Sequence, residues 1–289
     1  MTKILLLGAN GQVGWELRRC LLTVGEVVAT TRQDIDLTDN QKVTDAIAAI
    51  RPDLLINAAA YTAVEQAEEE PERANQVNGY ALEAISQCAK KYYFPIIHYS
   101  TDYVFDGTKE EPYTEEDTPN PINAYGRSKL LGEQILLSSG VPFLILRTSW
   151  IYSMRGKNFL LTMLRLSQER KEIRVVNDQY GTPTWSRFVA QVTADMLVAN
   201  VRDLKTYFDS HCGIYHLTPA GATTWYEFAR AIFSSVRNDF IKVLPISSAE
   251  YPTKAKRPKF SVLKPSFQRL YSVGSCPDWF AVFRLAVEA

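Results

Sequence analysis

Short apolar runs alternate with helix-length amphipathic stretches through the first half of the chain. The apolar runs are Lys3–Leu7, Glu26–Thr30, Leu54–Asn57, Pro95–Ser100 and Pro142–Thr148. Between them, apolar residues recur at helical spacing within Gln12–Val24, Gln41–Ile50, Glu72–Lys91 and Tyr125–Leu137. This alternation is typical of repeated βαβ units, in which helices cover both faces of a parallel sheet. We therefore expect an α/β protein with a Rossmann-type, doubly wound parallel sheet.

The pattern changes after Trp150. Helices are expected at Asn158–Arg170, Arg187–Ala199 and Trp225–Val236, and a short strand at Gly213–Leu217. Two segments are expected to be irregular, the turn-rich loop Val175–Thr184 and the basic stretch Ser247–Pro258. We expect residues 1–150 to form a first domain, to which part of 185–217 returns. Residues 151–289 should form mainly a smaller C-terminal α/β domain.

Composition excludes several classes of protein. The 289 residues carry 32 basic and 32 acidic side chains, without the basic excess of nucleic-acid-binding proteins. The N-terminal apolar run breaks at Gly8, and no stretch approaches the roughly 18 apolar residues of a membrane span. The four cysteines lie far apart without a CxxC pair, which favours free thiols in a reducing compartment. We expect a cytoplasmic protein with no nucleic-acid or membrane partner.

A glycine-rich turn, GANGQVG, follows the first expected strand and leads into a helix. Glycines permit a tight turn and a close approach of backbone N–H groups to a pyrophosphate, while the helix N-terminus adds partial positive charge. An ordinary strand–turn–helix is the alternative, but the position at the first βαβ unit favours dinucleotide binding. The GxxGxxG spacing resembles that of short-chain dehydrogenases. The cofactor residues expected from this turn are Gly8, Asn10, Gly11, Gln12, Val13 and Gly14.

The end of the second strand bears on the choice between NAD and NADP. An acid there would bind the ribose 2′-hydroxyl, but this chain has two threonines and Arg32, with no acid before Asp34. A guanidinium can form charge-assisted hydrogen bonds with a 2′-phosphate, which favours NADPH, with NADH as the alternative. Arg32 could also be a solvated loop residue. Asp36 and Leu37 are expected near the adenine.

Tyr125 and Lys129 lie four residues apart, on one face of an expected helix. A free tyrosine titrates at about 10, and a neighbouring ammonium lowers this pKa, so the pair can serve as a general acid–base. Thr101 lies at the C-terminal end of the fourth expected strand, and ligands bind at such strand ends in open α/β sheets. Thr101 could then bind a substrate carbonyl oxygen beside the tyrosine. The alternative is a surface helix, because this spacing often occurs by chance.

Seven motifs resemble those of the dTDP-4-dehydrorhamnose reductases, a family of extended short-chain dehydrogenases/reductases. In chain order they are GANGQVG, INAAAYTAV, HYSTDYVFDG, NAYGRSKLLGE, RTSWIY, NDQYGTPT and YHLTPAGATTWYEFA. The resemblance implies reduction of the C4 keto group of dTDP-4-dehydro-6-deoxy-L-mannose to dTDP-L-rhamnose, a bacterial cell-surface sugar donor. It also implies that residues 1–150 bind NAD(P) and that residues 151–289 mainly bind the substrate.

The resemblance implies a role for particular residues. Tyr125 would be the catalytic acid, Lys129 would bind the nicotinamide ribose and lower the pKa of the tyrosine, and Thr101 would position the substrate oxygen. The residues implied at the pyrophosphate are Gly11, Gln12 and Val13, and those lining the cofactor cleft are Ala58, Ala59 and Ala60. The residues implied at the substrate are Thr62, Thr101, Asp102, Tyr103, Tyr125 and Trp150.

The chain departs from the family pattern in two places. No acid ends the second strand, and Lys264 stands where the tail motif of the family usually has an acid. Some relatives bind Mg²⁺ through glutamates at a dimer interface. The acidic run 65–72 offers such ligands here, although acidic runs are usually solvated faces. Mg²⁺ and a homodimer therefore follow from the resemblance alone.

Two other functions remain open on the sequence. Another NDP-sugar epimerase, reductase or dehydratase is one, but a dehydratase needs a second acid after Thr101, where this chain has Asp102-Tyr103. The other is a non-catalytic NADP-binding regulatory subunit similar to the β subunit of methionine adenosyltransferase. His98 lies in an expected strand and should be packed rather than catalytic. Trp150 could stack on a sugar or thymine, or could belong to the core.

Overall fold

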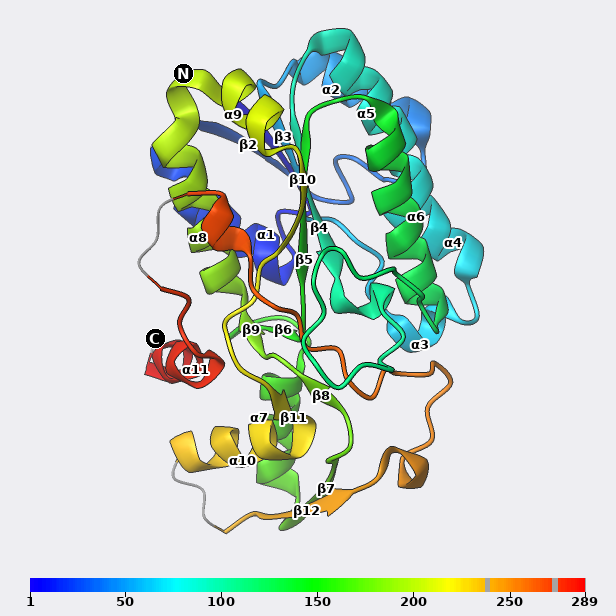
Figure 1. Cartoon of the computed structure of the whole chain (residues 1–289), viewed down its shortest axis with the longest axis vertical. Helices are drawn as coiled ribbons and strands as arrows, with labels where there is room; N and C mark the ends of the chain where they lie inside the picture. The colour runs from blue at the N-terminus through cyan, green and yellow to red at the C-terminus, as the bar shows by residue number, and fades with distance from the viewer. Residues whose placement is uncertain (237–239, 272–274, 289) are drawn as a thin grey trace.

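The apolar runs of the first half form the central sheet. The computed structural model describes residues 1–236, 240–271 and 275–288. All six strands of the sheet are parallel and lie in the order β10-β5-β4-β3-β1-β2 (Figure 1). They are β1 (Lys3–Leu7), β2 (Glu26–Thr30), β3 (Leu54–Asn57), β4 (Ile96–Thr101), β5 (Phe143–Thr148) and β10 (Gly213–His216). The strand order reverses at β1, and doubly wound sheets bind ligands beyond the strand ends at such a point. The expected doubly wound parallel sheet is confirmed.

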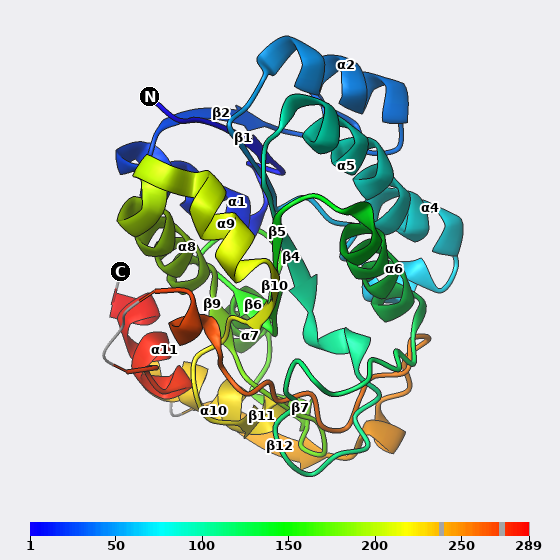
Figure 2. The same cartoon turned by 45° about the horizontal axis from the view of Figure 1, so that its top comes forward.

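Helices cover both faces of the sheet (Figure 2). One face carries α1 (Gln12–Cys20), α8 (Ser186–Asn200) and α9 (Leu204–His211), and the other carries α2 (Asn40–Ile50), α5 (Ala81–Tyr92) and α6 (Ala124–Ser139). Alternate residues of β1 point to opposite faces, so that Ile4 and Leu6 join one core and Leu5 and Leu7 join the other. Burial on both faces explains why these strands are continuously apolar.

The helix expected at Glu72–Lys91 is divided by a π-helical turn. Its parts are α4 (Pro71–Asn75), the π turn Gln76–Tyr80 and α5. In this turn the Asn78 side chain donates to the Tyr61 carbonyl and the Ser128 hydroxyl. A Cβ on Gly132 would lie 2.2 Å from the Asn78 carbonyl oxygen, so α6 packs closely against the turn. The irregular turn thus coincides with a tertiary contact, which helical periodicity does not reveal.

The C-terminal part of the chain forms a second apolar core. Its helices are α7 (Phe159–Glu169), α10 (Trp225–Ser235) and α11 (Trp279–Glu288), and its parallel strand pair is β7 (Glu172–Val176) with β12 (Lys242–Ile246). Tyr152 and Phe228 pack at its centre. In contrast, β10 pairs with β5 and so belongs to the central sheet. The boundary near residue 151 stays a prediction.

The segment expected as a turn-rich loop, Val175–Thr184, is partly strand, which corrects that expectation. It contains the end of β7 and the short strand β8 (Tyr180–Gly181), and it ends in β9 (Thr184–Trp185). The partners of the short strands are distant: β11 (Thr223–Thr224) pairs with β8, and β6 (Ile151–Tyr152) pairs with β9. Local turn residues cannot show such pairings. The remaining short helices are α3 (Val64–Ala67) and the 3₁₀ turns Leu21–Thr23, Asp102–Val104, Val201–Asp203, Ser248–Glu250 and Phe267–Arg269.

None of the helices within the described ranges combines the length and the apolar character that a bilayer crossing requires.

Candidate active site

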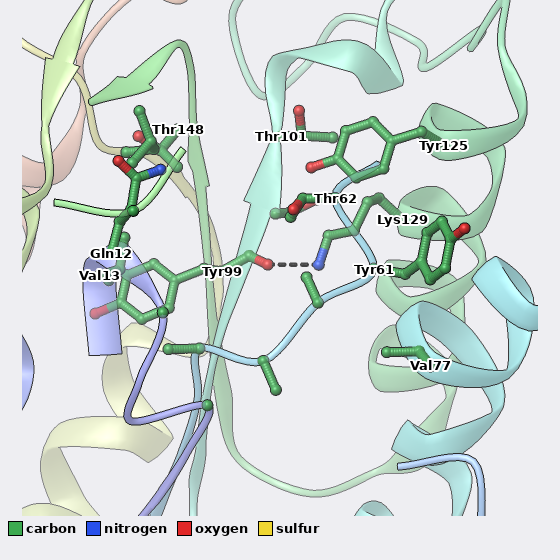
Figure 3. A pocket seen from close by; sticks show the side chains of 18 of the residues that line it. Gln12, Val13, Tyr61, Thr62, Val77, Tyr99, Thr101, Tyr125, Lys129 and Thr148 are labelled. Atoms are coloured by element: carbon green, nitrogen blue, oxygen red, sulfur yellow. Dashed lines mark hydrogen bonds between the residues drawn. The ribbon is translucent and has the colours of Figure 1, made fainter. Parts of the chain in front are cut away.

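A cavity of about 720 Å³ opens at the carboxyl ends of the central strands. Figure 3 shows Thr101, Tyr125 and Lys129 on one side of it and Gln12 and Val13 on the other. Every site residue expected from the sequence lines this cavity except Gly14. The residues after β3 that line the cavity are Ala58, Ala59, Ala60 and Thr62. The sequence therefore pointed to one place in the fold.

The glycine turn forms one wall of the cavity, together with the start of α1. Gly8 has a φ of +76°, and a Cβ there would lie 2.6 Å from the Ala59 nitrogen. A Cβ on Gly14 would lie 2.1 Å from the Gly8 carbonyl oxygen, so Gly14 lets the helix pack on the turn rather than lining the cavity. No side chain caps α1, whose first turn holds no acid, and Gly11, Gln12 and Val13 line the cavity. This open helix N-terminus fits a dinucleotide pyrophosphate.

A loop from the C-terminal part lies against the same glycine turn. The Gln12 Oε1 atom accepts hydrogen bonds from Ser153 Oγ at 2.9 Å and Asn158 Nδ2 at 2.8 Å. The Arg155 guanidinium stacks 3.3 Å from the ring centroid of Trp15. Arg155 and its neighbour Lys157 line the cavity. Neither cation was expected from the sequence, in which their position just before a helix is a weak local signal.

Arg32 lies at the mouth of the cavity. Its side chain is 64% exposed, and its Nε atom is 3.2 Å from Asp36 Oδ2. Hydrogen bonds from Thr38 and Arg32 hold the pKa of Asp36 below its usual value. Asp36 and Leu37 line the same end of the cavity. The preference for a 2′-phosphate stays a prediction.

The end of β4 forms the floor of the cavity. Thr101 Oγ1 donates to Asp102 Oδ1 at 3.1 Å and accepts from the Tyr103 backbone N–H at 3.2 Å. Asp102 is 2% exposed, and its burial raises the pKa of the carboxyl to about 7. The Tyr103 ring packs edge-on against Tyr125, with their centroids 5.9 Å apart. These contacts bring the expected substrate residues together around the strand end.

Tyr125 lies in the first turn of α6. The Asn123 side chain caps this helix by accepting from the Gly126 N–H at 2.7 Å. A Cβ on Gly126 would lie 2.1 Å from the Tyr103 carbonyl oxygen, so the glycine lets α6 approach the end of β4. Burial raises the pKa of Tyr125 to about 12, while a hydrogen bond with Thr101 opposes the rise. The phenol is therefore protonated at neutral pH.

Lys129 is 1% exposed and donates from Nζ to the Tyr99 carbonyl oxygen at 2.6 Å (Figure 3). Its Nζ also lies 3.0 Å from His98 Nε2. Burial lowers the pKa of Lys129 to about 7. The expected lowering of the Tyr125 pKa by Lys129 is not seen, because the amine is directed at the sheet and the phenol is desolvated. His98 is buried, as expected.

Trp150 has a φ of +44°, an unfavourable value for a bulky residue. Its ring stacks on Trp225, with a centroid distance of 3.5 Å and an interplanar angle of 6°. A Cβ on Gly181 would lie 2.3 Å from the same indole, so the ring is held between a glycine and a second tryptophan. Both tryptophans line the cavity. Trp225 was not among the expected site residues, although it lies in the last of the seven motifs.

The acidic run 65–72 pairs with cations and with the start of α6. Glu65 contacts Arg257, and Glu69 contacts Lys254. Glu68 Oε1 accepts from the backbone N–H at the start of α6 at 2.7 Å. In the part of the chain that the structure describes, no three metal-ligating side chains come together. These neutralised carboxylates do not fit a Mg²⁺ site within one chain.

Comparisons with known proteins agree with this geometry. The family described as "RmlD substrate binding domain" matches residues 1–287. The dTDP-4-dehydrorhamnose reductase of Burkholderia thailandensis is 45% identical over 99% of this chain and 98% of its own. That of Escherichia coli is 41% identical over 96% of this chain and 94% of its own.

Solved structures show the same relationship. The dTDP-4-dehydrorhamnose reductase of Bacillus anthracis, in complex with NADP, has a TM-score of 0.90 and 34% identity, covering 100% of this chain and 99% of its own. The UDP-glucose 4-epimerase of Thermus thermophilus, with a TM-score of 0.77, 21% identity and coverage of 99% and 98%, shares the fold. The chain therefore belongs to the RmlD family, to which it is similar along nearly its whole length.

Proposed function

We propose that this chain reduces the C4 keto group of dTDP-4-dehydro-6-deoxy-L-mannose to give dTDP-L-rhamnose, using NADPH in preference to NADH. The observation that carries the proposal is the group of buried Thr101, buried Lys129 and partly buried Tyr125 at the floor of a cavity whose opposite wall is the glycine turn. Family membership supports the same activity. The absence of a disulfide framework and the nucleotide-sugar substrate favour a cytoplasmic location.

The reaction needs one proton donor and a group that holds the carbonyl oxygen. When bound, the nicotinamide cofactor supplies the hydride. Tyr125 donates its phenolic proton to the oxygen that becomes the hydroxyl, and its raised pKa keeps it protonated until then. Thr101 Oγ1 binds the same oxygen, and Lys129 stabilises the phenolate when its amine is protonated.

The sugar and its nucleotide lie toward the C-terminal part in this proposal. Asp102 lines the cavity beside Thr101, so its carboxyl is the group of this strand end that can bind a sugar hydroxyl. Tyr103 and Thr62 line the cavity beside it. The stacked Trp150 and Trp225 both line the cavity and offer apolar surface to the sugar or the thymine.

Direct assay with the purified chain tests the proposal. We expect NADPH oxidation that depends on dTDP-4-dehydro-6-deoxy-L-mannose and yields dTDP-L-rhamnose, identified by NMR. NADH in place of NADPH should give a higher KM. A parallel reaction with dTDP-glucose, which lacks the keto group, should consume no NADPH.

Two results would contradict this proposal. NADPH binding without turnover of any 4-keto sugar would indicate a regulatory subunit, and a product epimerised but not reduced would indicate an epimerase.

A further inference from the structure

Behind Lys129, the floor of the cavity continues into two buried polar side chains that the proposed reaction does not use. His98 Nε2 lies 3.0 Å from Lys129 Nζ, and His98 Nδ1 lies 3.2 Å from Asn57 Nδ2. All three residues are 1% exposed. Asn57 and His98 are paired neighbours on β3 and β4, whereas Lys129 comes from α6. The chain Asn57–His98–Lys129 therefore runs from the sheet into the cavity.

The orientation of the Asn57 amide is determined by the backbone. Its Oδ1 atom accepts a hydrogen bond from the Ala59 N–H at 3.1 Å. If the amide were turned over, its NH₂ group would face this N–H, and two donors would oppose each other. The Asn57 NH₂ group is thus the part that faces His98.

The amide orientation in turn selects the tautomer of His98. Because Asn57 Nδ2 donates, His98 Nδ1 must accept, and the ring proton must lie on Nε2. Burial lowers the pKa of His98 well below its usual value, so at neutral pH the ring carries only this one proton. The Nε2–H bond therefore points at Lys129 Nζ.

This tautomer distinguishes the two forms of Lys129. A neutral amine has a lone pair that can accept from His98 Nε2–H while one of its own N–H bonds donates to the Tyr99 carbonyl. An ammonium has no lone pair, so its nitrogen could only face the His98 Nε2–H as a second donor at 3.0 Å. The geometry therefore stabilises the amine relative to the ammonium.

We propose that Asn57 and His98 are positioning residues for Lys129, which hold its Nζ at the floor of the cavity and favour the neutral amine. This inference rests on the proposed function for its consequence, because Asn57 and His98 would then set the pH at which Lys129 carries the positive charge that stabilises the Tyr125 phenolate.

Other charged groups around Lys129 act in the opposite direction or are neutralised. Glu133, on the next turn of α6, favours the ammonium. This carboxylate is itself held by Arg147 of β5 in a bidentate pair at 2.9 and 2.6 Å. Among the described residues that line the cavity near Lys129, burial raises the pKa values of Asp102 and of the tyrosines Tyr61, Tyr99, Tyr103 and Tyr125.

A measurement of the histidine tautomer tests the first step without any substrate. The chain has three histidines, so a ¹⁵N-histidine NMR spectrum is simple, and His98→Gln assigns the signals of His98. We expect the Nε2–H tautomer in a ring that is neutral at neutral pH, because burial holds its pKa well below the usual value. The Nδ1–H tautomer would overturn the proposal, as would a His98 ring that is protonated at neutral pH.

Two variants test the effect on Lys129. In Asn57→Asp, the carboxylate accepts from both the Ala59 N–H and His98 Nδ1–H, so the tautomer reverses and Nε2 accepts from the ammonium. In His98→Gln, the amide oxygen can turn toward Nζ and accept from it. A hydrogen bond to a charged group contributes about 1.5–3 kcal/mol, or about one to two pKa units. The Lys129 midpoint in the pH profile of kcat/KM, expected near 7, should therefore rise by about one to two pH units in both variants.

The control is His216→Gln, which replaces a fully buried histidine of β10 outside the cavity. It should lower the melting temperature without moving the midpoint. An unchanged midpoint in both His98→Gln and Asn57→Asp would overturn the proposal even if stability falls. If the chain reduced no 4-keto sugar, the tautomer measurement would still test the role of Asn57 and His98. A failure of the proposed activity can therefore be distinguished from a failure of this inference.

Discussion

Arg32 and Lys129 are two basic residues at opposite ends of one cavity, and their surroundings differ in every respect. Arg32 is 64% exposed at the mouth and pairs with Asp36. Lys129 is 1% exposed at the floor, where its Nζ meets a backbone carbonyl and a neutral imidazole. Water can screen the charge of Arg32, whereas burial shifts the ionisation of Lys129 itself.

The comparison teaches that charge in this cavity is used in two ways. At the mouth, a hydrated guanidinium can bind an anion with modest affinity and without any change of its own charge. At the floor, desolvation makes the charge of Lys129 depend on pH near neutrality. The sequence shows two basic residues. Only their different burial distinguishes a residue whose charge is constant from one whose charge changes with pH near neutrality.

The largest expected effect is at the floor. Tyr125→Phe removes the phenolic proton while keeping the ring, and we expect kcat to fall by about 10²–10⁴, the range for loss of a general acid. Affinity for NADPH and the melting temperature should change little. As a control, Tyr152→Phe alters a buried tyrosine of the C-terminal core and should leave kcat unchanged. A Tyr125→Phe variant with normal kcat would remove Tyr125 from the mechanism.

Lys129→Met should abolish most activity and yet stabilise the fold. The pKa of Lys129 is about 7 in the folded chain and about 10.5 when exposed, so folding releases protons between these values. Below about pH 7, the folded chain bears the whole free-energy cost of burying the Lys129 charge. This cost falls as pH rises from about 7 to about 10.5, and it is absent above about 10.5. We expect stabilisation on the order of a few kcal/mol near pH 6, measured by urea unfolding, and none at about pH 11.

The exposed cation provides the contrast for that experiment. Arg32→Met should leave the free energy of unfolding unchanged at both pH values, because its guanidinium is hydrated. Equal stabilisation by both substitutions would show that burial does not distinguish the two residues.

Arg155 tests whether the C-terminal loop contributes to cofactor binding. Arg155→Ala should raise KM for NADPH and for NADH by a similar factor, about tenfold, because a pyrophosphate is common to both. Arg19→Ala is the matched control, since Arg19 stacks 3.7 Å from the centroid of the same Trp15 ring but does not line the cavity. If KM rises as much in the control, the effect comes from Trp15 and not from a phosphate contact.

The smallest effect is expected at Arg32. Arg32→Ala should raise KM for NADPH about three- to tenfold and leave KM for NADH unchanged, because only NADPH has a 2′-phosphate. The difference should shrink as salt is added, since the site is exposed. An equal rise for both cofactors would mean that Arg32 supports the loop through Asp36 rather than binding phosphate.

The sequence was informative where function lies in contiguous residues. The glycine turn, the strand that ends at Thr101 and the Tyr125–Lys129 spacing are each local, so their place at one edge of the sheet follows from the βαβ pattern. The sequence was uninformative for residues that are far apart along the chain and in contact in the fold. Arg155 over Trp15, Trp225 on Trp150 and the pairing of β7 with β12 join segments whose local patterns do not refer to one another.

The amino-acid sequence by itself determined the doubly wound sheet and the set of chemical groups at its edge, because hydrophobic periodicity and motif spacing are properties of neighbouring residues. Only the tertiary structure decided the state of those groups. Burial raises the pKa of Tyr125 and lowers that of Lys129, and the Ala59 backbone orients Asn57 and thereby His98. Desolvation and hydrogen-bond direction depend on which atoms surround a group in three dimensions, and three separate elements, β3, β4 and α6, supply those atoms here.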